Sequence, residues 1–161
     1  MARDEPQSGH DPAKNGTKRN PVGLLLVTLS QEVAIMLTEA PVQAAIPASD
    51  MERAKRFYRD TLGLTISREA EDAVHFESGG TQFFVYPTSN AGQAPHTLAA
   101  WLVADLDAEM ADLRRRGVTF EEYDLPGLKT TNGVAEYPTM RGAWFKDSEG
   151  NILAVTQPRE G

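Results

Sequence analysis

A segment in the middle of the chain occurs twice, and this repeat constrains the fold more than any other feature. The first copy spans residues 49–65 and the second spans residues 104–119. Asp50 and Asp105 are 55 residues apart, and Gly63 and Gly117 are 54 residues apart. Similarity at a fixed spacing indicates one structural unit that is used twice. We therefore expect a domain built from two equivalent halves.

Each copy carries the start, the apolar face and the end of one helix. The short carboxylates of Asp50 and Asp105 suit a helix start, because their oxygens accept hydrogen bonds from the free amides there. Gly63 and Gly117 suit the ends, where a left-handed residue is needed. Residues at helical spacing then form an apolar stripe in each copy: Met51, Ala54, Phe57, Tyr58 and Leu62 in the first, and Leu106, Met110 and Leu113 in the second.

Strand signals flank each helix in the same order. They fall at residues 42–47, 64–67, 73–77 and 81–86 around the first helix, and at 97–103, 119–123, 142–146 and 151–157 around the second. The pair Gly79-Gly80 predicts a hairpin turn. The order is β-α-β-β-β, twice. This predicts an α+β domain in which two βαβββ modules form a curved mixed sheet, with helices on its outer face and a cavity on its inner face.

Charge and cysteine content narrow the class of partner. The 161 residues carry 16 Lys and Arg against 23 Asp and Glu, a formal net charge of −7, and contain no cysteine. An acidic chain is a poor match for nucleic acid, whose phosphates demand a basic face. The lack of cysteine excludes disulfide scaffolds and thiolate metal sites. We expect a soluble cytoplasmic protein, with neutral or cationic small-molecule partners and no membrane association.

The chain divides into three parts by composition. Residues 1–41 read as a largely disordered N-terminal extension, residues 42–158 as the folded domain, and residues 159–161 as a tail. Residues 22–37 are apolar but are interrupted by Gln31 and Glu32, so they are too short and too polar to span a bilayer. A signal peptide, a loosely attached helix or strand, and an upstream extension before a working start at Met36 all remain open.

Two motifs in the repeat carry a family resemblance. The first is Asp50-Met51-Glu52-Arg53-Ala54-Lys55-Arg56-Phe57-Tyr58, followed by Leu62-Gly63-Leu64; the second is the run from Trp144 through Asp147, Gly150 and Asn151. Together they resemble the vicinal oxygen chelate superfamily of glyoxalase I, bleomycin-resistance proteins, fosfomycin-resistance enzymes and extradiol dioxygenases. Ser148 stands where that family usually has proline. The resemblance covers about residues 42–158 and implies the paired βαβββ fold and a homodimer.

The resemblance also implies four metal-ligand positions, usually His, Gln or Glu. In this chain those positions hold Gln43, Phe84, Leu98 and Ala154. Only Gln43 can donate a lone pair, and a single neutral amide does not hold a metal ion against water. His96, two residues before Leu98, is the other weak candidate. We therefore expect no cofactor, with a divalent metal at Gln43 and His96 as the alternative.

Alternation from the same four positions predicts the lining of the cavity. The candidate ligand-contacting residues are Gln43, Ala45, Phe84, Tyr86, His96, Leu98, Ala154 and Thr156, with Pro47, Ala100 and Ile152 on the same face. Such a mostly apolar lining with an aromatic pair binds an organic ligand by burial and stacking. Trp101 falls on the helix-facing side, and His75 is expected at a sheet edge. The segment 124–141 is either a lid or a plain surface insertion.

Three functional hypotheses follow. The first is a metal-free protein that binds a small cationic or aromatic ligand, as the resemblance to bleomycin-resistance proteins implies. The second is a divalent-metal-dependent lyase, isomerase or dioxygenase of the same superfamily. The third is an interaction module whose dimer face matters more than its cavity. One fold hosts many chemistries, so the side chains of the site must decide among these hypotheses.

Overall fold

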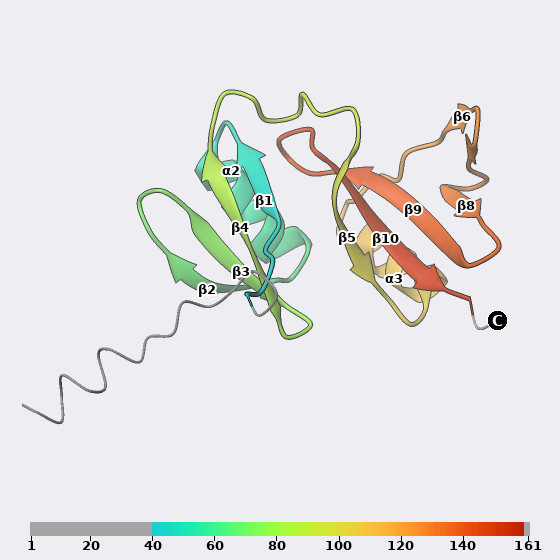
Figure 1. The fold of residues 1–161 in the computed structure, drawn as a ribbon, viewed down its shortest axis with the longest axis horizontal. Coiled ribbons are helices and arrows are strands. Elements are labelled where there is room, and N and C mark those ends of the chain that lie inside the picture. The colour runs from blue at the N-terminus through green and yellow to red at the C-terminus, as the bar shows by residue number, and fades with distance from the viewer. Residues whose placement is uncertain (1–39, 160–161) are drawn as a thin grey trace, which may run out of the picture. The chain divides into compact units, whose positions relative to one another are not determined.

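We describe residues 40–159 of the chain in a computed structural model. The described residues from Val42 onward belong to one compact unit (Figure 1). The expectations for the N-terminal extension, including the alternatives for residues 22–37 and the start at Met36, concern positions outside the described residues. No helix among residues 40–159 has the length and apolar character needed to cross a bilayer.

The first module has the predicted order of one strand, one helix and three strands. Its sheet has the strand order β1-β4-β3-β2, in which β1 runs parallel to β4 and the other pairs are antiparallel. Gly79 and Gly80 connect β3 to β4 with φ of +56° and +76°, which is the left-handed geometry of a tight hairpin turn. The elements are β1 (Ala45–Ala48), α2 (Met51–Arg56), η1 (Phe57–Thr61), β2 (Thr65–Glu69), β3 (Val74–Ser78) and β4 (Thr81–Pro87).

The second module repeats this topology with one addition. Its sheet has the order β5-β10-β9-β8, again with one parallel pair, β5 with β10. A short hairpin, β6 with β7, is inserted before β8. The elements are β5 (Thr97–Leu102), α3 (Leu106–Arg115), β6 (Asp124–Leu125), β7 (Leu128–Lys129), β8 (Val134–Glu136), β9 (Met140–Lys146) and β10 (Ile152–Pro158). The predicted α+β fold of two βαβββ modules is confirmed.

The strand predicted at residues 119–123 is wrong. Only Phe120 forms a β-bridge there, with Phe145, and the amide of Glu121 donates to the carbonyl of Trp144 at 2.7 Å. The strand that completes the sheet is β8, which pairs with the other half of β9. The two segments share one strand edge, and the inserted hairpin lies between them in sequence. A local pattern of β-forming residues does not reveal which segments will pair with each half of β9.

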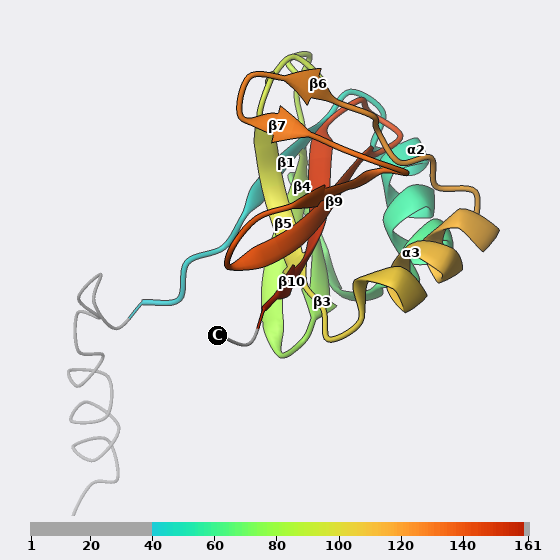
Figure 2. The ribbon, with the colours of Figure 1, turned by 90° about the vertical axis from the view of Figure 1, so that its right-hand side faces the viewer.

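The two helices lie on the same side of the sheets, and the hydrophobic core lies between these layers (Figure 2). Alternate strand residues point into this core. Phe83 and Val85 of β4 and Phe145 of β9 are buried there, together with Tyr58 and Met110 from the helical layer. The intervening residues must point to the opposite side, because side chains alternate along a strand. We call this side, away from α2 and α3, the open face.

The first helix widens before it ends. The Asp50 carboxylate accepts from the amide of Arg53 at 2.9 Å and caps α2 as predicted. In η1 the backbone hydrogen bonds take the wider spacing of a π-helix, so that the amide of Leu62 donates to the carbonyl of Phe57 at 3.0 Å. This wider turn continues the apolar stripe and places Tyr58 in the core with no exposed surface. Gly63 then ends the turn with φ of +74°.

The turn between β9 and β10 joins the two modules, and we call its residues Asp147, Glu149 and Asn151 the clasp. The Glu149 side chain is 0% exposed although it is charged. It accepts from the amides of Ser49 and Asp50 at 2.8 and 3.0 Å, and from Nε of Arg53 at 2.7 Å. These donors all lie at the start of α2, where unpaired amides and the helix dipole favour an anion.

Asp147 and Asn151 complete the clasp. The buried Tyr58 hydroxyl donates to Asp147 at 2.6 Å. The Asn151 amide group donates to the carbonyl of Pro47 at 2.8 Å and accepts from the amide of Gly92 at 2.9 Å. Burial and the Asp147 charge raise the pKa of Tyr58 well above its usual value, so this hydroxyl keeps its proton. The motifs that carry the family resemblance therefore serve here to dock the modules.

The Glu149 carboxylate makes the stability of the fold sensitive to acid. Burial opposes its ionisation, but hydrogen bonds from Arg53, from Ser49 and from the amides of Ser49 and Asp50 outweigh this and lower its pKa to about 2 from the usual 4.5. The lowered value stabilises the fold above pH 4.5, and this contribution disappears as the pH falls towards 2. At about 1.4 kcal/mol for each pKa unit, it amounts to about 3 kcal/mol.

We expect Glu149→Gln to lower the free energy of unfolding at pH 7 by about 2–3 kcal/mol, and to cost about half as much at pH 3, which is still above the folded pKa of about 2. Urea denaturation at both pH values measures the two differences. The matched control is Glu71→Gln, which removes the charge of an exposed glutamate that has no recorded partner among the described residues. An equal cost of Glu149→Gln at pH 7 and pH 3 would contradict the ionised clasp.

Candidate functional site

The first module contributes a row of rings to the open face. Phe84 of β4 pairs with Ala45 of β1 on one side and with His75 of β3 on the other. The ring of Phe84 lies 5.5 Å from that of His75 and 6.1 Å from that of Tyr86, between centroids. All three rings are partly buried. They form a continuous aromatic surface that remains accessible from the solvent side.

The sequence predicts His75 at a sheet edge, and this prediction is wrong. Its strand, β3, lies between β2 and β4, and β2 is the edge strand. The Arg68 guanidinium, Nη2, lies 2.7 Å from Nε2 of His75. Because a guanidinium only donates, Nε2 accepts and the proton of a neutral ring sits on Nδ1. Arg68 therefore fixes the orientation of the imidazole beside Phe84.

The second module contributes one indole above a floor of small residues. Trp144 of β9 pairs with Ala154 of β10, which in turn pairs with Ala100 of β5. The indole lies along its own strand over Gly142, where a Cβ atom would stand 3.1 Å from Cη2 of the ring. Any larger residue at position 142 would displace the ring. Small residues therefore give Trp144 its place on the open face.

Two contacts hold the Trp144 indole from the sides. Nε1 donates to the hydroxyl of Thr97 at 3.1 Å, and the ring of Tyr123 meets it edge-on, with 6.0 Å between centroids and an interplanar angle of 81°. Burial, with the nearby charge of Glu121, raises the pKa of Tyr123. The phenol is therefore protonated at neutral pH and can donate to a ligand.

The segment 124–141 is ordered into β6, β7 and β8, and its hairpin lies on the open-face side of the sheets (Figure 2). Thr130 anchors its base, because the hydroxyl accepts from the amide of Tyr123 at 2.7 Å and donates to Glu122 at 2.6 Å. The hairpin therefore stands beside the Tyr123–Trp144 pair. A lid-like movement of this segment remains a prediction.

The predicted site residues divide into two groups in the structure. Five of them occupy open-face positions: Ala45, Phe84, Tyr86, Ala154 and Thr156. Leu98 does not, because β5 carries an extra residue there: Thr97 pairs with Ile152, whereas Ala99 already pairs with Leu153. This bulge turns Leu98 towards the core, against which it packs. Gln43 and His96 are exposed and lie just before β1 and β5.

The pairing of Gln43 and His96 as metal ligands stays a prediction. Val42 and Ala44, on either side of Gln43, border the same hollow as residues 99–102. His96 lies three to six residues before those positions, roughly 10–20 Å along a strand, and is not among the residues that border this hollow. Among residues 40–159, no group of three or more His, Cys, Asp or Glu side chains is placed to hold a metal ion. Of the four positions that the resemblance implies, Gln43 alone carries a donor atom, and a single neutral amide does not fit a metal site of the family type.

A family model supports the fold at the level of sequence. Residues 40–155 match the model described as the Glyoxalase/Bleomycin resistance protein/Dioxygenase superfamily. The chain belongs to this superfamily. No curated protein matches the sequence significantly. Membership explains the paired modules and the clasp, and it leaves the chemistry of the open face to its own side chains.

Solved structures of the superfamily share the fold at low identity. A glyoxalase/bleomycin resistance protein/dioxygenase from Alicyclobacillus acidocaldarius has a TM-score of 0.59 and 19% identity, over 75% of this chain and 92% of that one. An antibiotic binding protein from a Streptomyces species has a TM-score of 0.56 and 23% identity, over 74% and 98%. A lactoylglutathione lyase from Agrobacterium tumefaciens has a TM-score of 0.56 and 17% identity, over 73% and 92%.

Trp144, Thr97 and Tyr123 are not among the site residues that the sequence pattern predicts. A signal for Trp144 was present, because it alternates with Ala143 and Phe145, which both lie in the core. Tyr123 and Thr97 carried no such signal. Tyr123 lies outside any strand, and Thr97 reaches the open face only because the bulge at Leu98 changes the alternation of β5.

Neighbouring phenylalanines test the assignment of the two faces in this superfamily member. Phe83 is 7% exposed and contacts the rings of Tyr58, Phe76 and Trp101 in the core. Phe84 lies on the open face. We expect Phe83→Ala to cost about 3–5 kcal/mol of unfolding free energy and Phe84→Ala about 1 kcal/mol, both measured by urea denaturation. Equal costs would contradict the face assignment.

Proposed function

We propose that this superfamily member binds a small organic ligand with an aromatic or cationic group on its open face, without a protein-held metal. The observation that carries this proposal is the exchange of chemistry at the family's ligand positions. Phe84 and Ala154 stand where the resemblance implies metal donors, and the Trp144 indole lies beside Ala154 on the second module. Rings with accessible faces bind flat apolar groups by burial and stacking.

The charge of the chain favours a cationic ligand over an anionic one. The whole chain has a formal net charge of −7, and a negative field raises the local concentration of cations. The faces of Trp144, Tyr86 and Phe84 also attract a cation through their quadrupoles. The protonated phenol of Tyr123 adds a single directional donor. These features support sequestration of the ligand, and none of them supplies a nucleophile or an activated water.

Two alternative functions have weaker support. A divalent-metal-dependent lyase, isomerase or dioxygenase is supported by superfamily membership, but the donor set described above does not fit it. An interaction module is supported by the exposed apolar residues at the junction of the sheets, where Val42 is 96% exposed and Leu102 is 76% exposed. We also propose a cytoplasmic location, since a chain without cysteine needs no oxidising compartment.

Berberine, a flat aromatic cation, tests ligand binding on the open face. We expect it to raise the melting temperature of the wild-type protein, because a ligand that prefers the native state stabilises it. Phe84→Ala and Trp144→Ala should each weaken binding by about tenfold, the equivalent of about 1.4 kcal/mol of lost stacking. Isothermal titration calorimetry measures the affinities at a temperature where every variant is folded.

The matched control is Phe57→Ala, which removes a partly buried ring from the helical layer. This variant should lose stability but keep the wild-type affinity for berberine. Undiminished berberine binding in both Phe84→Ala and Trp144→Ala would contradict the proposed site. A neutral aromatic compound of the same size that bound as tightly would contradict the cationic preference.

We further propose that the protein forms a homodimer that closes the open face. Ala45, Ala100 and Leu102 are exposed there, and an apolar sheet face of this kind is usually covered by a partner. A second copy seated on this face would convert it into the enclosed cavity that the sequence predicts. The ligand would then lie between the open face and the partner.

Sedimentation equilibrium tests the dimer. We expect the wild-type protein to have twice the mass of the 17.6 kDa chain, and Leu102→Glu to shift it towards the monomer, since a buried unpaired charge is costly at an interface. Ala111→Glu adds the same charge on the exposed side of α3 and should leave the dimer intact. A monomeric wild-type protein, or a dimer that resists Leu102→Glu, would contradict this arrangement.

A further inference from the structure

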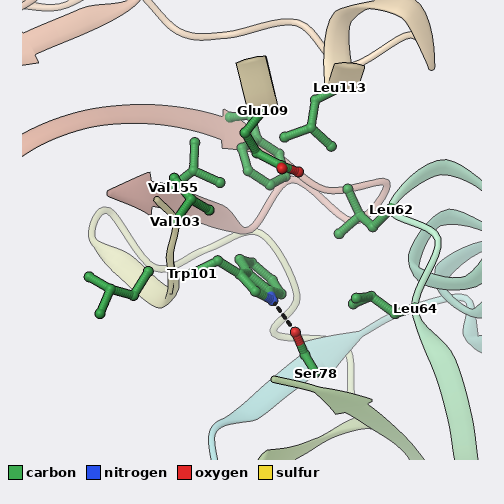
Figure 3. Close-up of a pocket in the computed structure, with 10 residues that line it drawn as sticks. Leu62, Leu64, Ser78, Trp101, Val103, Glu109, Leu113 and Val155 are labelled. Carbon is green, nitrogen blue, oxygen red and sulfur yellow. Dashed lines mark hydrogen bonds between the residues drawn. The ribbon is translucent and has the colours of Figure 1, made fainter. Parts of the chain in front are cut away.

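A second hollow lies at the side of the sheets that faces the helices, and the open-face residue Leu102 also borders it. It has a volume of about 250 Å³ and lies at the seam between the modules (Figure 3). Leu62 and Leu64 come from the end of the first helical segment, and Leu113 from α3. Trp101 comes from the helix-facing side of β5, and Val103 directly follows that strand. Its walls are therefore mostly apolar.

One acidic side chain lines this hollow. Glu109 of α3 is partly buried, and Figure 3 shows its carboxylate on the side of Leu62 and Leu113, across from Trp101. Among residues 40–159 it has no recorded hydrogen-bond or ion-pair partner for its side chain. A carboxylate that loses water without gaining a partner carries a cost, which a cationic ligand would offset.

The other carboxylates around Glu109 on the same helix are all engaged. Asp105 caps the amide of Ala108 at 3.0 Å, and Asp107 pairs with Arg141 at 2.8 Å. Asp112 pairs with Arg115 at 2.6 Å and with Arg116 at 2.7 Å. Asp112 therefore holds Arg115 and Arg116, while Arg114 donates to the carbonyl of Asn132 at 3.0 Å. Glu109 differs from these neighbours in facing an apolar space with its charge unpaired.

A second polar group lies at the other end of the hollow. Nε1 of Trp101 donates to the hydroxyl oxygen of Ser78 at 3.1 Å (Figure 3). This bond fixes the indole and leaves the Ser78 hydroxyl with its own proton to donate. The hollow thus offers a carboxylate at one end, a hydroxyl donor at the other, and apolar walls between them.

We propose that this hollow is a binding site for a small primary ammonium on a compact apolar body, with Glu109 as its counter-ion. Carboxylate and ammonium form a charge-assisted hydrogen bond, about twice as strong as a neutral one. The volume lies below the roughly 300–1,000 Å³ of drug-sized sites, which limits the body to about one ring. An anion of the same shape would be repelled by Glu109.

The two tryptophans separate this site from the open face. Trp101 lines the hollow, whereas Trp144 lies on the other side of the sheets. The Trp144→Phe variant therefore carries Trp101 as its one indole, since the chain has 2 tryptophans. A ligand of the hollow changes Trp101 fluorescence in this variant. Binding of berberine to the open face and binding in the hollow consequently fail or succeed independently.

Three probes with the same phenyl body test the charge requirement in the Trp144→Phe background. They are 2-phenylethylammonium, the neutral 2-phenylethanol and the anionic 3-phenylpropanoate, titrated at pH 7 and low salt. We expect the ammonium to bind with a dissociation constant on the order of 1 mM, and the alcohol about tenfold more weakly. The propanoate should give no saturable change.

Glu109→Gln should bring the ammonium and the alcohol to the same affinity, because it removes the charge and keeps the shape. Glu71→Gln, which removes an exposed charge outside the hollow, should preserve the tenfold difference. The proposal is overturned by equal affinities for ammonium and alcohol in the Trp144→Phe protein. It is equally overturned by a difference that survives Glu109→Gln, or by the absence of any saturable Trp101 response.

Discussion

The ionised side chain of Glu149, buried at the start of α2, is the interaction on which the rest of the structure depends. It belongs to the turn between β9 and β10 of the second module, and it accepts hydrogen bonds from Ser49, Asp50 and Arg53 of the first. Together with the bond from Tyr58 to Asp147, it fixes how the helical layer of one module meets the sheet of the other. Both the open face and the hollow beside Glu109 take their walls from two modules held in this way.

The repeat in the sequence predicted the topology because the same local signals for helix start and helix end occur in both copies. Caps at Asp50 and Asp105, and left-handed glycines at 63 and 117, appear in the structure as expected. Where prediction failed, the determinant was not local. The bulge at Leu98 depends on how β5 pairs with β10, and the missing strand at residues 119–123 depends on how β9 shares its edge with β8.

The candidate site shows the same division between local and distant determinants. Alternation placed Ala45, Phe84 and Tyr86 on the open face, since β1 and β4 are regular. It did not reveal that Trp144 lies over Gly142, which depends on a glycine two residues earlier on the same strand. Nor did it reveal Glu109, whose position in the helical stripe gave no hint that it would face an apolar space at the seam.

These features give one superfamily scaffold two faces with different chemistry. The open face offers rings and small residues at positions where the family resemblance implies metal donors. Elemental analysis of the protein, purified without a chelator and incubated with divalent zinc, nickel, manganese and iron, tests this account most directly. We predict well below one bound ion per chain after desalting, and berberine binding that chelator leaves unchanged. One ion per chain that is lost in Gln43→Ala would contradict it.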